Sequence, residues 1–367
     1  MLPFDFDPSI RTLYGPGRLS ELGDIATQFG GRALLVADPG IVQAGIVALG
    51  VASLEQANVA VQVFSGVSEN PTSEDIETGL TAATAGDPVD LIVAIGGGSA
   101  MDCAKGINFL LSNGGKIQDY HGFGKADRPM LPSIGVPTTA GTGSEAQSYA
   151  LISDAETHVK IACGDRKARF RAVILDPELA VSGPIPVKAN AGYDAMAHAV
   201  ESYVCTKANP ISRIYGREAF RLLDTALIPF VEGDETASGD TLLGAHLAGM
   251  AIEASMLGAA HACANPLTAK FDTTHGIAVG VMLASVVAYN LVEESDRYEG
   301  LTDHPDIVAR LREVRTSLAL PERLRDLGVQ EGAIPELAQA ASEQWTGAHN
   351  PRPVDAKVCG ELYEAAY

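Results

Sequence analysis

Two residues that could bind a metal lie at helical spacing in the segment 191–204. Asp194 and His198 stand four residues apart in the alanine-rich run Ala191-Gly-Tyr-Asp-Ala-Met-Ala-His198. Alanine favours helix, and residues at i and i+4 share one helix face, so the carboxylate and the imidazole are expected to converge. The same spacing is also typical of an ordinary pair on a helix surface.

Two further imidazoles, His261 and His275, follow later in the chain. Pro266 between them is expected to end one helix, and a Thr-Thr pair just before His275 is placed to cap the next. Two helix ends would then face the first pair. One carboxylate with three neutral imidazoles suits Fe(II) or Zn(II) and leaves room for a substrate oxygen.

The first half of the chain alternates strand and helix patterns. Compact apolar runs predict buried strands at residues 32–37, 59–64, 90–95 and 132–137, and helical spacing predicts helices at 19–29, 41–57 and 73–85. Further strand-like segments lie at 148–152, 159–163 and 173–175. This alternation predicts an α/β domain with a mostly parallel sheet.

A glycine turn follows the strand 90–95. The glycines from Gly96 let the backbone approach a ligand, and the helix start behind them could hold a pyrophosphate. Alternatively, Ser99 and Asp102 form a capping box that needs no ligand. Asp38, at the end of the first strand, is where a ribose 2′-hydroxyl would be read and a 2′-phosphate repelled, or it is a turn residue before Pro39.

A small-residue loop with hydroxyl groups, Thr138–Glu145, either folds over a cofactor or makes a tight connection. From about residue 186 only helical patterns remain, at 188–206, 210–231, 240–263, 274–290, 305–318, 334–344 and 354–366. We therefore expect a dinucleotide-binding domain at 1–180 and an all-α metal-binding domain at 181–367. A cleft between domains would bring their sites together.

Composition narrows the possible partners. A length of 367 residues with 46% hydrophobic content predicts two domains, and the net charge of −20 argues against nucleic acid or an anionic membrane as a partner. Five widely spread cysteines are expected to be reduced thiols in a cytoplasmic protein. Cys263 lies two residues from His261, about 200° around a helix, and is expected to point away from the metal. The N-terminus lacks signal-peptide character, and no run is expected to span a membrane.

Together these segments resemble the iron-containing (group III) alcohol dehydrogenase family, whose fold is shared with glycerol dehydrogenase and dehydroquinate synthase. The resemblance covers nearly the whole chain. It rests on four motifs in order: Gly96-Gly-Gly-Ser-Ala-Met-Asp-Cys-Ala-Lys105, Pro137-Thr-Thr-Ala-Gly-Thr-Gly-Ser-Glu145, Gly192-Tyr-Asp-Ala-Met-Ala-His198, and the block from His261 to His275-Gly276.

The resemblance implies a set of site residues. Metal ligands would be Asp194, His198, His261 and His275, with Fe(II) preferred and Zn(II) able to compete. Contacts to NAD would come from Asp38, Asn70, Gly97, Gly98, Ser99, Asp102, Thr138, Thr139, Thr142 and Lys160. No catalytic residue beyond the metal site is implied, and we expect a homodimer or larger homo-oligomer.

The segment Trp345–Arg352 resembles the family loop that reaches toward the substrate. Trp345 and His349 are therefore candidates for the substrate pocket, and ordinary loop roles fit them equally well. The other pocket candidates are Tyr149, Ile252 and Asn265.

One position departs from the family. Many members carry a histidine four residues after the third ligand, in a His-Pro pair that helps to relay protons, whereas this chain has Asn265 before Pro266. An amide can orient a substrate or a water but is no general acid or base near pH 7. The released proton is expected to leave through the nicotinamide ribose or water, with His349 and His246 as weaker candidates.

These inferences predict a metal-dependent alcohol dehydrogenase or aldehyde reductase that transfers hydride between NAD(H) and a small polar substrate. A phosphonate- or sulfonate-aldehyde reductase and a non-redox lyase like dehydroquinate synthase are the alternatives. Both would need a basic cluster, and the helical half shows few basic residues near the ligands. A binding protein without activity would be expected to have lost ligands, yet all four are present.

Overall fold

The computed structural model describes residues 3–157 and 159–367, which form two compact units. The α/β unit comprises residues 8–139 and 144–183, and the helical unit comprises residues 3–7, 140–143 and 184–367. The sequence predicted one boundary, between residues 180 and 181, so that each domain would be one continuous segment. In the structure two short segments of the first half lie with the helices instead.

The α/β unit is built on a six-stranded sheet in the order β1-β9-β6-β4-β2-β3, in which every pairing is parallel. Its strands are β1 (Arg11–Tyr14), β2 (Arg32–Val36), β3 (Ala60–Phe64), β4 (Leu91–Gly96), β6 (Ser133–Pro137) and β9 (Ala172–Leu175). The central strands β4, β6 and β9 are buried along their whole length, as expected for apolar strands covered on both faces. This sheet confirms the predicted α/β fold.

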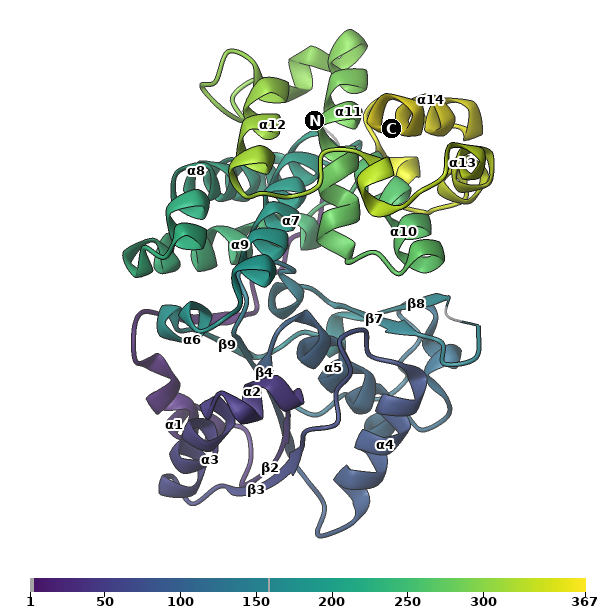
Figure 1. Ribbon diagram of the computed structural model, residues 1–367. Helices are drawn as coiled ribbons and strands as arrows, with labels where there is room; N and C mark the ends of the chain where they lie inside the picture. Colours follow the sequence, from purple (N-terminus) through teal and green to yellow (C-terminus); the bar gives the residue numbers. More distant parts are fainter. Residues whose placement is uncertain (1–2, 158) are drawn as a thin grey trace. The chain divides into compact units, whose positions relative to one another are not determined.

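Helices cover both faces of this sheet. Figure 1 shows α1 and α3 on one face and α4 and α5 on the other. The helices of the unit are α1 (Leu22–Ala26), α2 (Pro39–Gln43), α3 (Ile46–Gln56), α4 (Ser73–Thr84), α5 (Gly98–Asn113) and α6 (Pro177–Val181). The helix predicted at 41–57 is two helices, because Gly45 adopts a left-handed conformation (φ 78°) between α2 and α3.

A second, smaller sheet accompanies the large one, in the order β5-β8-β7. Its strands are β5 (Gly122–Phe123), β7 (Tyr149–Ser153) and β8 (Lys160–Gly164), and β7 pairs with β8 antiparallel. Short 3-10 turns complete the unit at Arg18–Glu21, Ile117–Tyr120, Ser144–Ala146 and Arg166–Ala168. The predicted strands at 148–152 and 159–163 therefore form a hairpin outside the parallel sheet.

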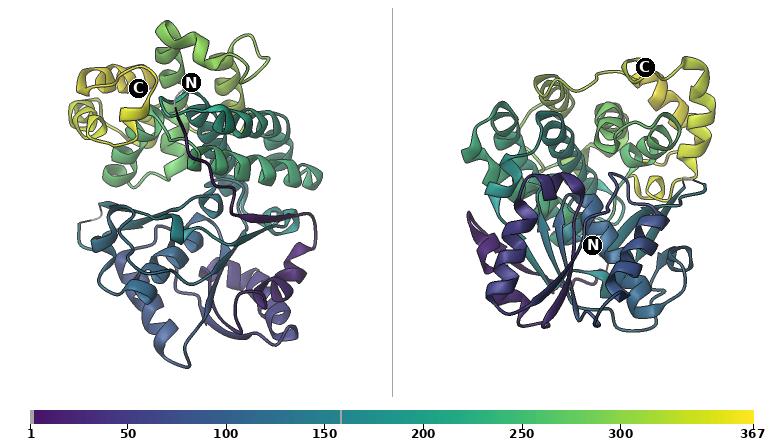
Figure 2. Two further views of the ribbon diagram at one scale, coloured as in Figure 1. Left: turned by 180° about the vertical axis from the view of Figure 1, so that it is seen from behind. Right: turned by 60° about the horizontal axis from the view of Figure 1, so that its bottom comes forward.

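The helical unit is organised around α7 (Ile185–Val204), which packs against α8, α9 and α11. Its other helices are α8 (Pro210–Glu232), α9 (Ser238–Glu253), α10 (Ala259–Phe271), α11 (His275–Glu294), α12 (Ile307–Ser317), α13 (Ile334–Ser342) and α14 (Ala356–Ala366). Its 3-10 turns are Glu235–Ala237, Ser295–Tyr298, Leu324–Leu327, Glu331–Ala333 and Gly347–His349. Both views of Figure 2 show α13 and α14 side by side near the C-terminus.

The N-terminal segment joins this unit through an aromatic contact. The rings of Phe6 and of Tyr215 on α8 lie 6.1 Å apart between centroids, tilted by 50°. Such a tilted contact is a favourable arrangement of two aromatic rings. It is one contact that holds residues 3–7 to the helical unit, although the strand that follows them belongs to the α/β unit.

The predicted helix 240–263 is wrong. The structure ends α9 at Glu253 and starts a new helix, α10, at Ala259, with Gly258 at its N-cap. Pro266, expected to end a helix, lies inside α10. The apolar pattern continues across residues 254–258 and so conceals the break. Thr274 stands at the N-cap of α11, but its side chain makes no capping hydrogen bond.

Helix α11 and the 3-10 turn after it, His275–Tyr298, are long and apolar enough to cross a membrane by length and hydropathy. No membrane-spanning run was expected from the sequence. Burial explains it, because 61% of the apolar window lies inside the unit and α11 packs against α7, α10 and α14. Its composition is that of a core helix.

Candidate metal centre

Helix α7 supplies the first two residues of the predicted centre. Asp194 and His198 lie one turn apart on the same face, with His198 Nε2 3.6 Å from Asp194 Oδ2, and both side chains are buried. The alanines around them have little side chain, which lets neighbouring helices approach α7 closely. The predicted convergence of this pair is what the structure shows.

Two helix N-termini bring the other imidazoles. His261 is the third residue of α10 and His275 the first of α11. His261 Nε2 lies 3.5 Å from Asp194 Oδ1, and its ring stacks on that of His198 with centroids 4.8 Å apart. Ligand atoms of Asp194, His261 and His275 all lie within 4.8 Å of one another. The structure thus brings the four predicted residues together.

Glu201, which the sequence analysis missed, lies behind His261. Its Oε2 is 2.6 Å from His261 Nδ1, and its Oε1 accepts a hydrogen bond of 2.7 Å from the backbone N–H of Ala260. A carboxylate only accepts, so Nδ1 carries a proton, and in the neutral ring that binds a metal Nε2 keeps its lone pair on the side of Asp194. Glu201 therefore fixes the tautomer that a metal ligand needs.

Two glycines allow these close approaches. A Cβ at Gly276 would lie 2.2 Å from Asn190 Oδ1 and 3.0 Å from Asp194 Cβ, so only glycine lets α11 begin this close to α7. A Cβ at Gly258 would lie 2.9 Å from Glu201 Oε1. The glycine that follows His275 in the sequence motif is thus a packing requirement of the centre.

The charges of the cluster stabilise one another. Burial alone would raise the pKa of Asp194, but the imidazoles of His198, His261 and His275 lower it below its ordinary value. Burial lowers the pKa of His198. For His261 burial also acts downward, yet the contacts with Asp194 and Glu201 outweigh it and raise the pKa to about 9. The centre holds a carboxylate and strongly favours positive charge beside it.

The residues fit a divalent metal ion. Asp194 Oδ1 and His261 Nε2 are buried and have no hydrogen-bond partner among the described residues. Buried polar atoms are costly unless something pairs with them, and these two point to one small region with His275. Three imidazoles and one carboxylate are a borderline donor set, which suits Fe(II) or Zn(II). Asp194, His198, His261 and His275 would hold the ion.

The thiol of Cys263 does not join this set. Its partners are on the C-terminal helix, where Tyr363 donates a hydrogen bond of 2.6 Å to the Cys263 carbonyl. Its thiol interacts with that of Cys359, and this contact and burial raise the pKa of Cys263. This agrees with the expectation that Cys263 points away from the ligands, and all five cysteines are free.

In the α/β unit, Asp38 and the glycine turn lie together at the carboxyl ends of β2 and β4. Asp38 Oδ1 accepts from the N–H of Ile41 at 3.1 Å and so caps α2. Its Oδ2 would be 3.1 Å from a Cβ on Gly96. The turn role and a place beside the glycines are thus both realised. A carboxylate at this point is placed where a ribose would be read.

The capping box expected at the start of α5 is not formed. The N-cap is Gly97, without a side-chain cap, and Ser99 Oγ instead donates to the carbonyl of Glu69. Asp102 is engaged elsewhere, since it accepts from Ser144 Oγ and from the N–H of Leu151 at 3.1 Å. The N-terminus of α5, with Gly98 as its first residue, is a helix end of the kind that binds phosphate.

The remaining predicted cofactor residues divide between the two units. Lys160 Nζ lies 3.2 Å from Asn70 Oδ1 in the α/β unit. Thr139 lies close to Gly97, whose Cβ would be 3.3 Å from its Oγ1, and the buried Thr138 has no partner for its Oγ1 among the described residues. Thr142 belongs to the helical unit. All ten residues stay predicted NAD contacts.

The pocket candidates also divide between the units. Tyr149 begins β7 in the α/β unit, where its ring lies 5.7 Å from that of Phe123. The other four belong to the helical unit: the buried Ile252 on α9, Asn265 on α10, Trp345, which is 43% exposed, and His349. Burial and Lys207 lower the pKa of His349. His246 is buried in α9.

The loop after α13 is tied to the start of α10. The N–H of Ala259 donates to Asn350 Oδ1 at 3.3 Å, and Asn350 Nδ2 donates to Asn290 Oδ1 at 2.7 Å. Asn350 and Glu201 thus cap the first turn of α10 from two distant parts of the sequence, because Gly258 has no side chain with which to do so. The loop and His261 share this support.

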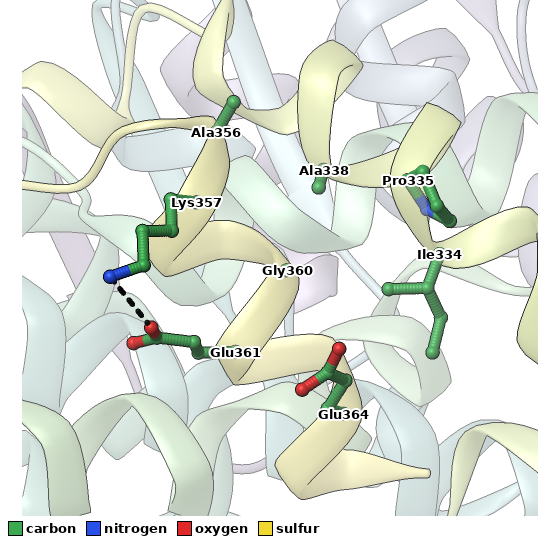
Figure 3. A pocket seen from close by; sticks show the side chains of 8 residues that line it. All are labelled: Ile334, Pro335, Ala338, Ala356, Lys357, Gly360, Glu361 and Glu364. Atoms are coloured by element: carbon green, nitrogen blue, oxygen red, sulfur yellow. Dashed lines mark ion pairs between the residues drawn. The ribbon is translucent and has the colours of Figure 1, made fainter.

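A surface hollow of about 440 Å³ lies elsewhere, between α13 and α14. Figure 3 shows its lining of Ile334, Pro335 and Ala338 on one helix and Ala356, Lys357, Gly360, Glu361 and Glu364 on the other. Lys357 Nζ pairs with Glu361 at 3.6 Å. None of the four metal-centre residues lines this hollow, so it is separate from the centre.

Comparison with known proteins agrees with this architecture. The family described as "Iron-containing alcohol dehydrogenase" matches residues 8–177, and "Fe-containing alcohol dehydrogenase family, C-terminal" matches residues 188–367. The 1,3-propanediol dehydrogenase of Citrobacter freundii is 32% identical, over 99% of each chain. Alcohol dehydrogenase 4 of Schizosaccharomyces pombe is 35% identical, over 92% of this chain and 83% of the other. The crystal structure of a 1,3-propanediol oxidoreductase superposes over 100% of both chains with a TM-score of 0.95 and 30% identity.

Fold, centre and relatives define an oxidoreductase that acts on alcohols and aldehydes. The predicted fold class and activity are confirmed. The chain belongs to the iron-containing alcohol dehydrogenase family.

Proposed function

We propose that this protein is an NAD-dependent, iron(II)-dependent dehydrogenase of small polar alcohols, which reduces the corresponding aldehydes in the reverse direction. The observation that carries this proposal is the buried set of three imidazoles and one carboxylate, in which neither Asp194 Oδ1 nor His261 Nε2 has a hydrogen-bond partner among the described residues. Bound there, iron(II) would supply Lewis-acid polarisation of the substrate oxygen.

Each part of the chain has a defined task in this reaction. The start of α5 and the glycine turn would bind the pyrophosphate of NAD, and Asp38 would accept a hydrogen bond from the ribose. Bound there, NAD would supply a hydride acceptor for the carbinol carbon, and the hydroxyl proton would have to leave separately. Asn265 has no titrating side chain, so that proton would pass through the ribose hydroxyls or water.

The alternatives with acidic substrates receive less support. The charged groups that most strongly affect the pKa values of Asp194, His198 and His261 are these residues themselves, His275 and Glu201. None of these is a lysine or an arginine. A phosphonate, a sulfonate or the substrate of a dehydroquinate synthase would find no lysine or arginine among these groups to pair with its negative charge, which disfavours these alternatives.

We also propose that the protein works in the cytoplasm as a homodimer or larger homo-oligomer. The five free, buried cysteines support a reducing compartment. Sedimentation of the purified protein would test the assembly state.

The test is a steady-state assay with NAD and NADP on C2–C4 alcohols and aldehydes, after loading with Fe(II) or Zn(II) or treatment with chelator. We expect turnover with NAD that chelation abolishes and metal restores. His261→Ala should lose most bound metal and lower activity by roughly 100-fold or more. His304→Ala is the matched control, because the His304 imidazole is not part of the centre. Its Nε2 pairs with Asp224 at a distance of 2.8 Å. Full metal content and turnover in His261→Ala would refute the site.

A further inference from the structure

The inference concerns Asn265, which lies four residues after His261 on α10. Side chains at i and i+4 share a helix face, with about 5–6 Å between their Cβ atoms. His261 is buried, whereas Asn265 is only partly buried. The Asn265 side chain therefore lies one helical turn from the ligand candidate His261, on the same face of α10 and partly open to solvent.

The orientation of this amide is fixed through Gln344. Gln344 Nε2 donates to the carbonyl of Ala340 at 3.3 Å, and Gln344 Oε1 accepts from Asn265 Nδ2 at 3.0 Å. The Ala340 carbonyl belongs to the last turn of α13 and can only accept. Gln344 must therefore turn its NH₂ toward Ala340 and its oxygen toward Asn265, and Asn265 must turn its own NH₂ toward Gln344.

This chain of amides ends in an acceptor. Asn265 Oδ1 is the group that remains, and no described residue donates a hydrogen bond to it. The backbone N–H of Gln344, bonded to Ala341 at 3.1 Å, also holds this residue at the helix end. Asn350 ties the other end of the loop to α10, with its Oδ1 3.3 Å from the N–H of Ala259. The loop is thus pinned to α10 on both sides of Trp345 and His349.

We propose that Asn265 Oδ1, oriented by Gln344, accepts a hydrogen bond from a second hydroxyl group of the substrate. This inference rests on the proposed function and narrows its substrate class to diols and hydroxyaldehydes. A substrate without that hydroxyl leaves the acceptor unpaired when its end of the pocket is filled, which costs affinity. A sulfonate offers no donor, and its negative charge would face the partial negative charge of the amide oxygen. Gln344 acts through Asn265 and is a positioning residue.

The experiment compares 1,3-propanediol with 1-propanol, which differ by one hydroxyl. The ratio of their kcat/KM values is measured in the iron-loaded protein and in Asn265→Leu, Gln344→Ala and Gln339→Ala. General damage lowers both values equally and leaves the ratio unchanged, so the ratio reports the hydroxyl contact. Gln339→Ala is the matched control, since Gln339 lies on the last turn of α13 and its amide donates to Glu343 at 2.7 Å rather than to Asn265.

We expect the diol to be preferred, and we expect the preference to fall by roughly ten-fold in Asn265→Leu, the loss of one hydrogen bond. Gln344→Ala should also lower the preference for the diol, by raising KM for the diol. Gln339→Ala should leave the preference unchanged. An unchanged ratio in Asn265→Leu, or a preference for 1-propanol in the unaltered protein, would overturn the inference.

Binding gives a readout that does not depend on turnover. Dissociation constants of the two alcohols for the metal-loaded protein, from ligand-observed NMR titration, should show the same preference and the same losses. If the protein binds the diol preferentially through Asn265 but oxidises no alcohol with NAD, the proposed function fails while the inference stands. If it oxidises both alcohols and binds them equally, the inference fails while the function stands.

Discussion

The carboxylate of Glu201 makes two contacts with α10: its Oε1 lies 2.7 Å from the backbone nitrogen of Ala260, and its Oε2 lies 2.6 Å from His261 Nδ1. A single side chain of α7 thus fixes both where α10 begins and which nitrogen of His261 is left to bind. Metal affinity should therefore depend on a residue that is not a ligand.

Replacing Glu201 tests this dependence. Glu201→Gln keeps the size of the side chain, but one end of the amide must then face a donor, either Ala260 N–H or His261 Nδ1–H, with its own NH₂. We expect metal affinity to weaken by roughly 10–100-fold, measured by competition with a chromophoric chelator. Glu218→Gln is the control, because Glu218 pairs with Arg221 on an exposed face of α8. Equal affinities in both variants would contradict the assignment.

Gly276 should be irreplaceable at the start of α11. In Gly276→Ala the new Cβ would lie 2.2 Å from Asn190 Oδ1 and 2.6 Å from the Asn190 carbonyl, so α11 must move away from α7 and take His275 with it. We expect a loss of roughly 1–3 kcal/mol in the free energy of unfolding and weaker metal binding. Gly280→Ala, where the closest contact would be 3.2 Å to the ring of Tyr193, should cost less. Urea titration and metal analysis of both variants check this order.

Asp38 should set the choice between NAD and NADP. Asp38→Asn removes the charge, yet an asparagine can still cap α2 by accepting from Ile41 N–H, so the turn is kept. Without the carboxylate a 2′-phosphate no longer meets like charge, and the preference of kcat/KM for NAD should narrow by roughly ten-fold or more. Asp87→Asn, a change at an exposed partner of Arg32, should leave the preference unchanged. Equal kcat/KM values with NAD and NADP in the unaltered protein would contradict the assignment of Asp38 to ribose recognition.

Above pH 7, the pH dependence of the reaction rate should not be determined by His349. Burial and the charge of Lys207 lower the pKa of His349 below its ordinary value, so the folded protein holds it neutral at pH 7 and above. Below the ordinary pKa of about 6.5 the unfolded chain binds a proton that the folded protein resists, so stability falls as the pH falls through this window. His349→Ala should therefore leave the pH–rate profile above pH 7 unaltered and weaken the loss of stability on acidification. If the substitution erased an ionisation near pH 7 with metal content intact, His349 would be the proton relay.

The sequence predicted the local part of the centre and missed the part that depends on packing. Asp194 and His198 follow from helical period alone, since the pair needs only one helix. Glu201 also lies on their face, three residues after His198, but its partners Ala260 and His261 are about sixty residues away in sequence. Nothing in the local pattern of α7 indicates them.

The start of α10 was hidden for a related reason. Residues 254–258 are apolar or small and continue the helical pattern of α9, and Gly258 alone is a weak stop. What starts α10 at Ala259 is capping by Glu201 and Asn350, which only the folded chain provides. Likewise, Pro266 predicts a helix end from local chemistry, but α10 packs against α11 and α13 and runs on to Phe271. Tertiary contacts override the local signal there.

Helix α10 should fold poorly on its own, because the side chains that cap its first turn, Glu201 and Asn350, come from other parts of the chain. With Gly258 at its start and Pro266 in its interior, the isolated segment has little tendency to nucleate, so the helix should order only when α7 and the C-terminal loop have docked. Its amides should then exchange with solvent in the same cooperative opening as those of the loop around Asn350. Metal binding at His261 would slow that opening throughout, so occupancy of the centre would protect the distant end of the chain from proteolysis.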